Sequence, residues 1–253
     1  MKYWMLAGAA CAALNVLSMP ASAANSPSAA TPAKAYASSA DQAVEAFYAS
    51  RGGSSLWLRN AGDTAAARSM LGVLQRAPLD GFASGPALAA QAQALLAQAQ
   101  SGDRAALVSA DRLLSAAWVA YVQALQTPPP GMTYADSWVA PRHLTAGQIL
   151  AAAAAAPSLA NHVRSLSNVN PLYAQLREAA WTAGASDQRV LSNLDRLRTA
   201  PFQKRYIMVD AASARLYMIE NGQIADSMKV IVGKPTSQTP MLASTIYHAT
   251  LNP

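Results

Sequence analysis

Residues 205–233 read RYIMVDAASARLYMIENGQIADSMKVIVG and decide the fold class of this chain of 253 residues. Residues 206–209 and 216–220 are apolar runs of strand length. The dipeptide Asn221-Gly222 between strand-like runs predicts a type I′ hairpin turn, because both central residues of that turn need positive φ. The second strand of the hairpin is expected to continue through residues 229–232. The stretch therefore predicts a β-meander.

Upstream of this stretch, residues 41–200 contain the start and stop signals that are typical of helices. In the longest candidate helix, Trp118 and Tyr121 share an apolar face before the run TPPPG ends the pattern. A later helix is expected to carry Leu172 and Trp181 on its apolar face. Residues that can cap a helix N-terminus precede the candidates: Asp41, Asp63, Asp103, Thr145, Asn170 and Ser186.

A helical region followed by a meander is an α+β arrangement. The sequence predicts an all-helical domain over residues 41–200 and β structure over residues 204–253, with a boundary near Pro201. About fifty residues are few for a β-domain without disulfides, so we expect an unfinished domain with open strand edges.

The N-terminus has the pattern of an export signal. Lys2 precedes an apolar run over residues 3–17, and small residues at 21–23 precede a cleavage site. Residues 1–23 are therefore expected to be a signal peptide rather than a membrane span, with a buried N-terminal helix as the alternative. Residues 24–40 are rich in Ser, Pro and Ala and are expected to form a flexible linker. We expect a periplasmic protein whose mature chain has no transmembrane span.

Cysteine and charge narrow the classes of function. Cys11 is the only cysteine and lies in the expected signal peptide, so the mature chain can form no disulfide, while lipidation at Cys11 stays open. The formal net charge is +6 at pH 7. The basic residues are scattered, without the patch and interleaved aromatics of a nucleic-acid-binding protein. A basic exported protein suits an anionic wall or membrane surface, although an ordinary solvated surface accounts for the same charge.

The residues alone reveal no active site. Three histidines lie far apart, without the spacing of a metal site such as H-E-x-x-H: His143, His162 and His248. The tripeptide SMK at residues 227–229 has the spacing of a Ser-x-Lys dyad but lies in a strand beside a hairpin. Gly233-Lys234 lacks the upstream glycine of a phosphate loop. The sequence therefore predicts no catalytic, cofactor-binding or metal-binding residue and no cofactor.

Residues 205–253 resemble the start of the catalytic domain of the large L,D-transpeptidases, the YkuD-fold enzymes of YcbB type. The matching positions are Leu216, Tyr217, Asn221-Gly222, Met228, Val230, Val232-Gly233-Lys234, Thr239-Pro240 and Asn252-Pro253. The helical region resembles the scaffold domain of the same family through FYASRGGSSLWL at residues 47–58 and LDGFASGP at residues 79–86. In the second motif, Phe82 stands where the family has leucine.

The resemblance implies a helical scaffold domain over residues 41–200, followed by the first strands of a β-rich YkuD-like catalytic domain over residues 204–253. Such enzymes cross-link peptidoglycan in the periplasm through a cysteine of an S-H-G-C motif with a histidine partner. The cysteine attacks the carbonyl after diaminopimelate in a donor tetrapeptide, releases D-alanine and passes the acyl group to an acceptor amine. The implied partners are peptidoglycan tetrapeptide donor and acceptor stems, and other cell-wall synthesis proteins are a further option.

The sequence departs from the family at the catalytic motif. No S-H-G-C occurs before Pro253, so none of the family's catalytic residues can be assigned. We expect the chain as written to be an inactive fragment of an L,D-transpeptidase that forms no cross-linked product. The alternative is a non-catalytic exported helical module that binds the cell wall or a partner protein, since the same lack of a nucleophile supports it.

Overall fold

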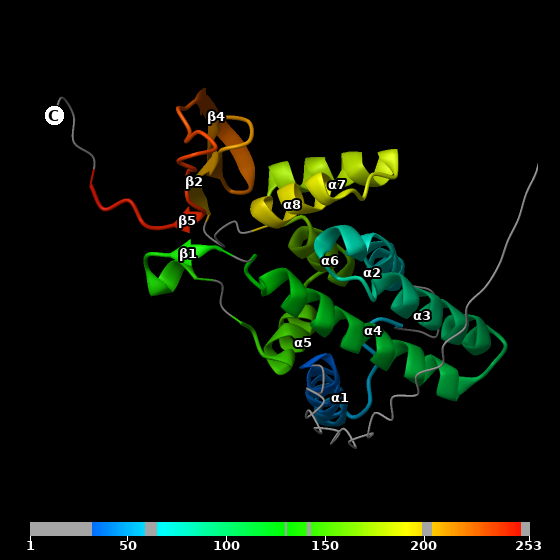
Figure 1. Ribbon diagram of the computed structural model, residues 1–253. Helices are drawn as coiled ribbons and strands as arrows, with labels where there is room; N and C mark the ends of the chain where they lie inside the picture. Colours follow the sequence, from blue (N-terminus) through cyan, green and yellow to red (C-terminus); the bar gives the residue numbers. More distant parts are fainter. Residues whose placement is uncertain (1–31, 59–64, 130, 141–142, 199–203, 249–253) are drawn as a thin grey trace, which may run out of the picture.

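The computed structural model describes residues 32–58, 65–129, 131–140, 143–198 and 204–248. The fold is α+β, as predicted, with a helical region followed by a small antiparallel sheet (Figure 1). The helical elements are α1 (Pro32–Ser50), α2 (Ala65–Arg76), the 3-10 helix η2 (Ala77–Asp80), α3 (Gly85–Gln100), α4 (Arg104–Gln126), the 3-10 helix η3 (Ser137–Val139), α5 (Ala146–Ala155), α6 (Leu159–Ser167), α7 (Pro171–Ala183) and α8 (Gln188–Leu197). The strands are β1 (Thr133–Tyr134), β2 (Arg205–Asp210), β3 (Arg215–Glu220), β4 (Gln223–Lys229) and β5 (Leu242–Ala243).

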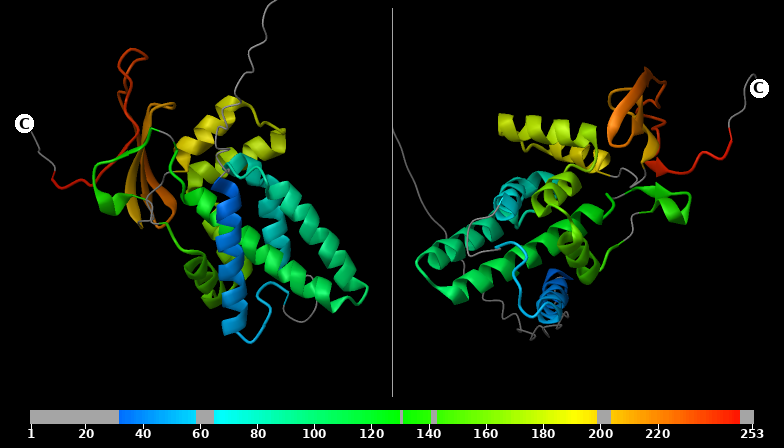
Figure 2. Two further views of the ribbon diagram at one scale, coloured as in Figure 1. Left: turned by 60° about the horizontal axis from the view of Figure 1, so that its bottom comes forward. Right: turned by 180° about the vertical axis from the view of Figure 1, so that it is seen from behind.

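Helix α4 is the centre of the helical region, where α1, α2, α3 and α5 pack against it (Figures 1 and 2). Trp118 and Tyr121 are fully buried, as their helical spacing predicts. The ring of Trp118 meets that of Trp57 edge to face, with 6.3 Å between centroids. By length and composition alone α4 could cross a membrane, but 56% of its apolar stretch is buried inside the protein. We therefore describe α4 as a core helix.

A buried carboxylate on α4 explains the FYASRGGSSLWL motif. Asp111 Oδ1 accepts the backbone N–H groups of Trp57 and Leu58 at 2.8 and 2.9 Å. Its Oδ2 accepts the N–H of Leu56 at 2.9 Å and the hydroxyl of Tyr48 at 2.5 Å. Both ends of the motif therefore converge on one side chain, which fixes the loop after α1 against the core helix.

Three of the six predicted cap residues are confirmed as side-chain caps. Asp103, Thr145 and Asn170 each accept hydrogen bonds from backbone N–H groups in the first turns of α4, α5 and α7. The cap of α8 is Asp187 instead of the neighbouring Ser186. A carboxylate at that position satisfies two unpaired N–H groups of the first turn.

The start of α1 differs from the prediction. The helix begins at Pro32, before the expected cap Asp41, and so includes residues that we expected to be a flexible linker. Proline at the first helical position and a run rich in alanine both favour a helix there. The expected cap Asp63 and the expected signal peptide, residues 1–23, lie outside the described residues.

Two features of the later helices were not predicted. Helix α6 is capped by Ser158, whose hydroxyl accepts the N–H of Asn161, and follows α5 after a short break. On α7, the buried residues are Tyr173, Arg177 and Ala180, whereas Trp181 is 46% exposed. The apolar pattern of α7 predicted the wrong buried face, because Arg177 lies at the centre of the face that is buried. A buried arginine needs a partner, and sequence periodicity does not reveal one.

The sheet has the order β2-β3-β4, and all its pairs are antiparallel. Asn221 and Gly222 have φ angles of 49° and 78°, which confirms the predicted type I′ turn. Strand β4 ends at Lys229 instead of continuing to residue 232, and the N–H of Val230 donates to the carbonyl oxygen of Ala214. Within the described residues, β2 and β4 are the open edges of this sheet.

A second, two-stranded pair joins distant parts of the chain. Strand β1 lies in the connection between α4 and α5 and pairs in parallel with β5, which follows the sheet (Figure 1). The pairing was not predicted, since both strands are two residues long. The strand-like run expected from residue 245 has no strand over residues 245–248, and residues 249–251 lie outside the described part.

Candidate functional site at the domain junction

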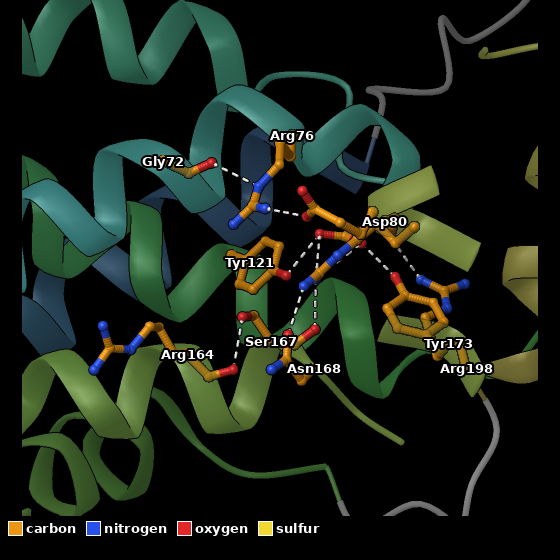
Figure 3. Close-up of polar contacts among 11 residues, drawn as sticks. Gly72, Arg76, Asp80, Tyr121, Arg164, Ser167, Asn168, Tyr173 and Arg198 are labelled. Carbon is orange, nitrogen blue, oxygen red and sulfur yellow. Dashed lines mark hydrogen bonds and ion pairs between the residues drawn. The ribbon is translucent and has the colours of Figure 1, made fainter. Parts of the chain in front are cut away.

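A buried carboxylate, Asp80, lies at the end of η2 and is 2% exposed. Its Oδ2 accepts the hydroxyl of Tyr121 on α4 at 2.7 Å, and its Oδ1 accepts the hydroxyl of Tyr173 on α7 (Figure 3). The turn forms because Pro78 lies at the second position of the 3-10 helix and Gly81 ends it at φ 80°, a conformation that favours glycine. The turn therefore places a charge inside the protein, where it must be paired or hydrogen-bonded.

Arg177 supplies the opposite charge. Its side chain is 4% exposed, and its Nη1 lies 3.4 Å from Asp80 Oδ1. Nη1 also donates to the carbonyl oxygen of Ser167 at 2.6 Å, and Nη2 donates to the side-chain oxygen of Asn168 at 2.8 Å. Burial opposes the charge and is the largest single influence, but Asp80, Tyr121 and Tyr173 together outweigh it and raise the pKa of Arg177. The guanidinium is therefore a permanent cation with several acceptors.

The two tyrosines act as hydrogen-bond donors at any ordinary pH. Burial, followed by the negative charge of Asp80, raises the pKa of Tyr121 and Tyr173 well above the ordinary 10.0. Neither hydroxyl is thus poised to exchange a proton near neutrality. The Asp80 cluster, made of Asp80, Tyr121, Tyr173 and Arg177, therefore joins η2, α4 and α7 to one another.

Arg198 ties the Asp80 cluster to the end of the helical region. Its Nη1 donates to the carbonyl oxygens of Asp80 and Ala124, at 3.0 and 3.1 Å, and its Nη2 donates to Asp195 at 2.9 Å. Gly81 makes room for this side chain, since a Cβ there would lie 3.2 Å from Nη1. One guanidinium therefore holds together the C-terminal ends of α4 and α8, the points from which the chain leaves toward β1 and β2.

An open cavity of about 290 Å³ lies between α8 and the turn from β2 to β3. Leu176, Asn193, Arg196 and Leu197 line it from the helical side. The turn contributes Asp210 and Ser213, among others. Asp210 shapes the turn, because its Oδ1 accepts the N–H of Ala212 at 3.0 Å.

Residues 232–240, which carry the motif V-G-K-x-x-x-x-T-P, form a loop that is closed by hydrogen bonds between its own residues. The N–H of Gly233 donates to the hydroxyl of Thr239 at 2.8 Å, and the N–H of Ser237 donates to the carbonyl oxygen of Lys234 at 2.8 Å. A Cβ on Gly233 would lie 2.1 Å from the carbonyl oxygen of Ser237, so only glycine fits. The two motif residues at the ends of the loop thus contact each other directly, which explains why glycine and threonine occur at that spacing.

The structure does not bring together the residues that the sequence analysis weighed as reactive groups, namely the three histidines and Ser227 of the SMK tripeptide. His162 packs edge to face on Trp118, with 5.8 Å between ring centroids, and burial lowers its pKa. His143 and His248 are exposed on other segments. Ser227 accepts a hydrogen bond from Arg215 Nη2 at 2.6 Å, so its hydroxyl is held by a cation. In the described residues, no group of three or more His, Cys, Asp and Glu side chains could hold a metal ion.

The Asp80 cluster was missed by sequence reasoning. The signal for it lies on α7, where Arg177 falls between Tyr173 and Ala180 on one helical face. An arginine at the centre of an otherwise apolar face indicates a buried partner of opposite charge.

Comparisons with known proteins identify both regions. Residues 42–179, more than half of the chain, match the family model of the scaffold domain. Residues 204–253 match the model of the L,D-transpeptidase catalytic domain. No curated protein and no solved structure gives a match.

Proposed function

Because this chain belongs to the scaffold-domain family and continues into residues of an L,D-transpeptidase catalytic domain, we propose that it serves the cross-linking of peptidoglycan in the periplasm. The observation that carries the proposal is the order of the two matches, scaffold first and catalytic domain second. The combination is similar to L,D-transpeptidases of the YcbB type.

In this proposal the reaction is an acyl transfer through a cysteine. The thiolate attacks the carbonyl carbon that joins diaminopimelate to the terminal D-alanine of a donor tetrapeptide. The C–N bond breaks, D-alanine leaves as an amine with a proton from a histidine, and a thioester remains. An acceptor amine then attacks the thioester, a new amide forms, and the thiol is released.

In this proposal, residues 1–253 provide structural support for the reaction and not the reacting groups. Cys11 is the only cysteine among residues 1–253 and belongs to the proposed signal peptide, so we place the Cys/His motif outside them. The Asp80 cluster and Arg198 fix α7 and α8, and the sheet β2-β3-β4 follows directly on α8. We propose that this arrangement presents the catalytic domain on a rigid helical platform.

The proposal can be tested on the gene, on the reaction and on the exported protein. The coding sequence after the Pro253 codon should continue in frame to an S-H-G-C motif, and the continued protein should release D-alanine from tetrapeptide stems unless that cysteine is replaced by alanine. A stop codon at that point, together with binding of the chain to purified sacculi, would instead favour a non-catalytic wall-binding module. N-terminal sequencing of the exported protein should place the mature start near residue 24.

A further inference from the structure

The connection between α4 and α5 contacts the segment that follows the sheet through a set of specific bonds. The N–H of Thr133 donates to the carbonyl oxygen of Met241 at 2.9 Å, and the N–H of Ala135 donates to that of Ala243 at 2.9 Å. These two bonds form the parallel β1–β5 pair. They join residues more than a hundred positions apart in the chain, because β1 belongs to the helical region and β5 to the region matched by the catalytic domain.

Asp136 extends the contact beyond the strands. Its Oδ2 accepts the N–H of Thr245 at 2.9 Å and the hydroxyl of Ser244 at 3.2 Å, while its Oδ1 accepts the hydroxyl of Tyr247 at 2.7 Å. The three donors come from one short segment. A single carboxylate thus fixes the path of residues 244–247.

Trp138 completes the set. Its Nε1 donates to the hydroxyl oxygen of Thr245 at 3.0 Å. Its ring meets that of Tyr247 edge to face, with 6.3 Å between centroids and an angle of 87°, an arrangement that is favourable for aromatic pairs. Both rings are more than half exposed, so the contact has little buried area to support it and depends on these directed bonds.

We propose that residues 133–138 form a latch, a second and non-covalent attachment that positions the catalytic-domain segment 241–247 on the helical region. The chain link after α8 is the first attachment. The latch closes as a unit, because its strand bonds, the bonds of Asp136 and the aromatic pair all join the same two segments. Asp136 is a positioning residue, since it acts through the backbone of residues 244–247.

The latch can be tested by amide hydrogen exchange on the full chain without substrate. In Asp136→Ala the N–H of Thr245 loses its acceptor, so its amide should exchange faster whether or not the latch opens as a unit. The informative amides are those of Thr133 and Ala135, whose acceptors are main-chain carbonyl oxygens that the substitution leaves in place. If the latch opens as a unit, both should exchange roughly tenfold faster, because cooperative units open together.

Two further variants sharpen the result. Trp138→Phe keeps an aromatic ring but removes the donor to Thr245, and should speed the same two amides to a smaller extent. Asp226→Ala is the matched control: its carboxylate accepts only the N–H of the adjacent Ser227 among the bonds described, and exchange at Thr133 and Ala135 should not change. Unchanged exchange at both amides in Asp136→Ala, or equal acceleration in Asp226→Ala, would overturn the proposal.

The result of the exchange experiment does not depend on the proposed transpeptidase reaction. Exchange is measured without donor or acceptor stems, so a failed latch leaves the transpeptidase assignment untouched. Conversely, a stop codon after Pro253 would remove the proposed activity and leave the latch as a contact between the two matched regions.

Discussion

Replacement of Asp80 by asparagine tests the Asp80 cluster most directly. The substitution keeps the shape of the side chain but removes its charge, and leaves Arg177 as a cation that is 4% exposed. Loss of one partner of a buried ion pair costs about 3–5 kcal/mol. Arg177 keeps its bonds to Ser167 and Asn168, so we expect the lower end of that range, about 3 kcal/mol. For a chain of this size, this corresponds to a fall in Tm of about 6–12 °C.

The assay is urea unfolding followed by tryptophan fluorescence. Trp118 stacks on Tyr121 with 6.0 Å between ring centroids, so its emission reports on the helical core beside the Asp80 cluster. Asp195→Asn is the matched control, because the Asp195 side chain is 45% exposed in its ion pair with Arg198. That substitution should change the free energy of unfolding by less than about 1 kcal/mol.

A double variant separates the loss of the ion pair from a general loss of packing. In Asp80→Asn combined with Arg177→Met, no buried charge is left unpaired, so the double variant should be more stable than Asp80→Asn alone. The reasoning is refuted if Asp80→Asn lowers the free energy of unfolding by less than about 1 kcal/mol, or if the double variant is no more stable than Asp80→Asn alone.

Three further predictions concern Asp111, Tyr48 and Gly233. Asp111→Asn turns a donor toward the N–H of Leu56 and should cost about 2 kcal/mol in urea unfolding, whereas Asp103→Asn on the same helix should cost less than about 0.5 kcal/mol because asparagine caps equally well. Burial and the charge of Asp111 raise the pKa of Tyr48 above its ordinary 10.0, so the folded state keeps a proton that the unfolded state releases. Stability should therefore be full below pH 10 and fall above it, with a shallower fall in Tyr48→Phe when Tm is followed against pH. Gly233→Ala should force the closed loop open, seen as faster amide exchange at residue 233 with an unchanged Tm of the helices.

Local signals in the sequence predicted much of the fold. The cap residues Asp103, Thr145 and Asn170 mark real helix starts, and Asn221-Gly222 marks the hairpin. These signals succeed because cap and turn energies depend on residues only a few positions apart. The α+β class follows from the same local patterns.

The junction could not be predicted in the same way. The resemblance of LDGFASGP to a family motif singles out Asp80, but only the fold reveals that its partners come from α4 and α7. The apolar face of α7 was misjudged because Arg177 is stabilised by that distant carboxylate. The β1–β5 pair was missed because two-residue strands have no periodicity to detect, and their pairing depends on contacts across the whole chain.

The Asp80 cluster also sets an order in which the chain can fold. Asp80 is 41 residues from Tyr121, but 93 from Tyr173, 97 from Arg177 and 118 from Arg198. A growing polypeptide that has reached the end of α4 has made only one of these partners, and burying a carboxylate without its countercharge is costly. We therefore expect the turn that carries Asp80 to stay loosely packed in the nascent chain until α7, which carries Arg177, has been synthesised.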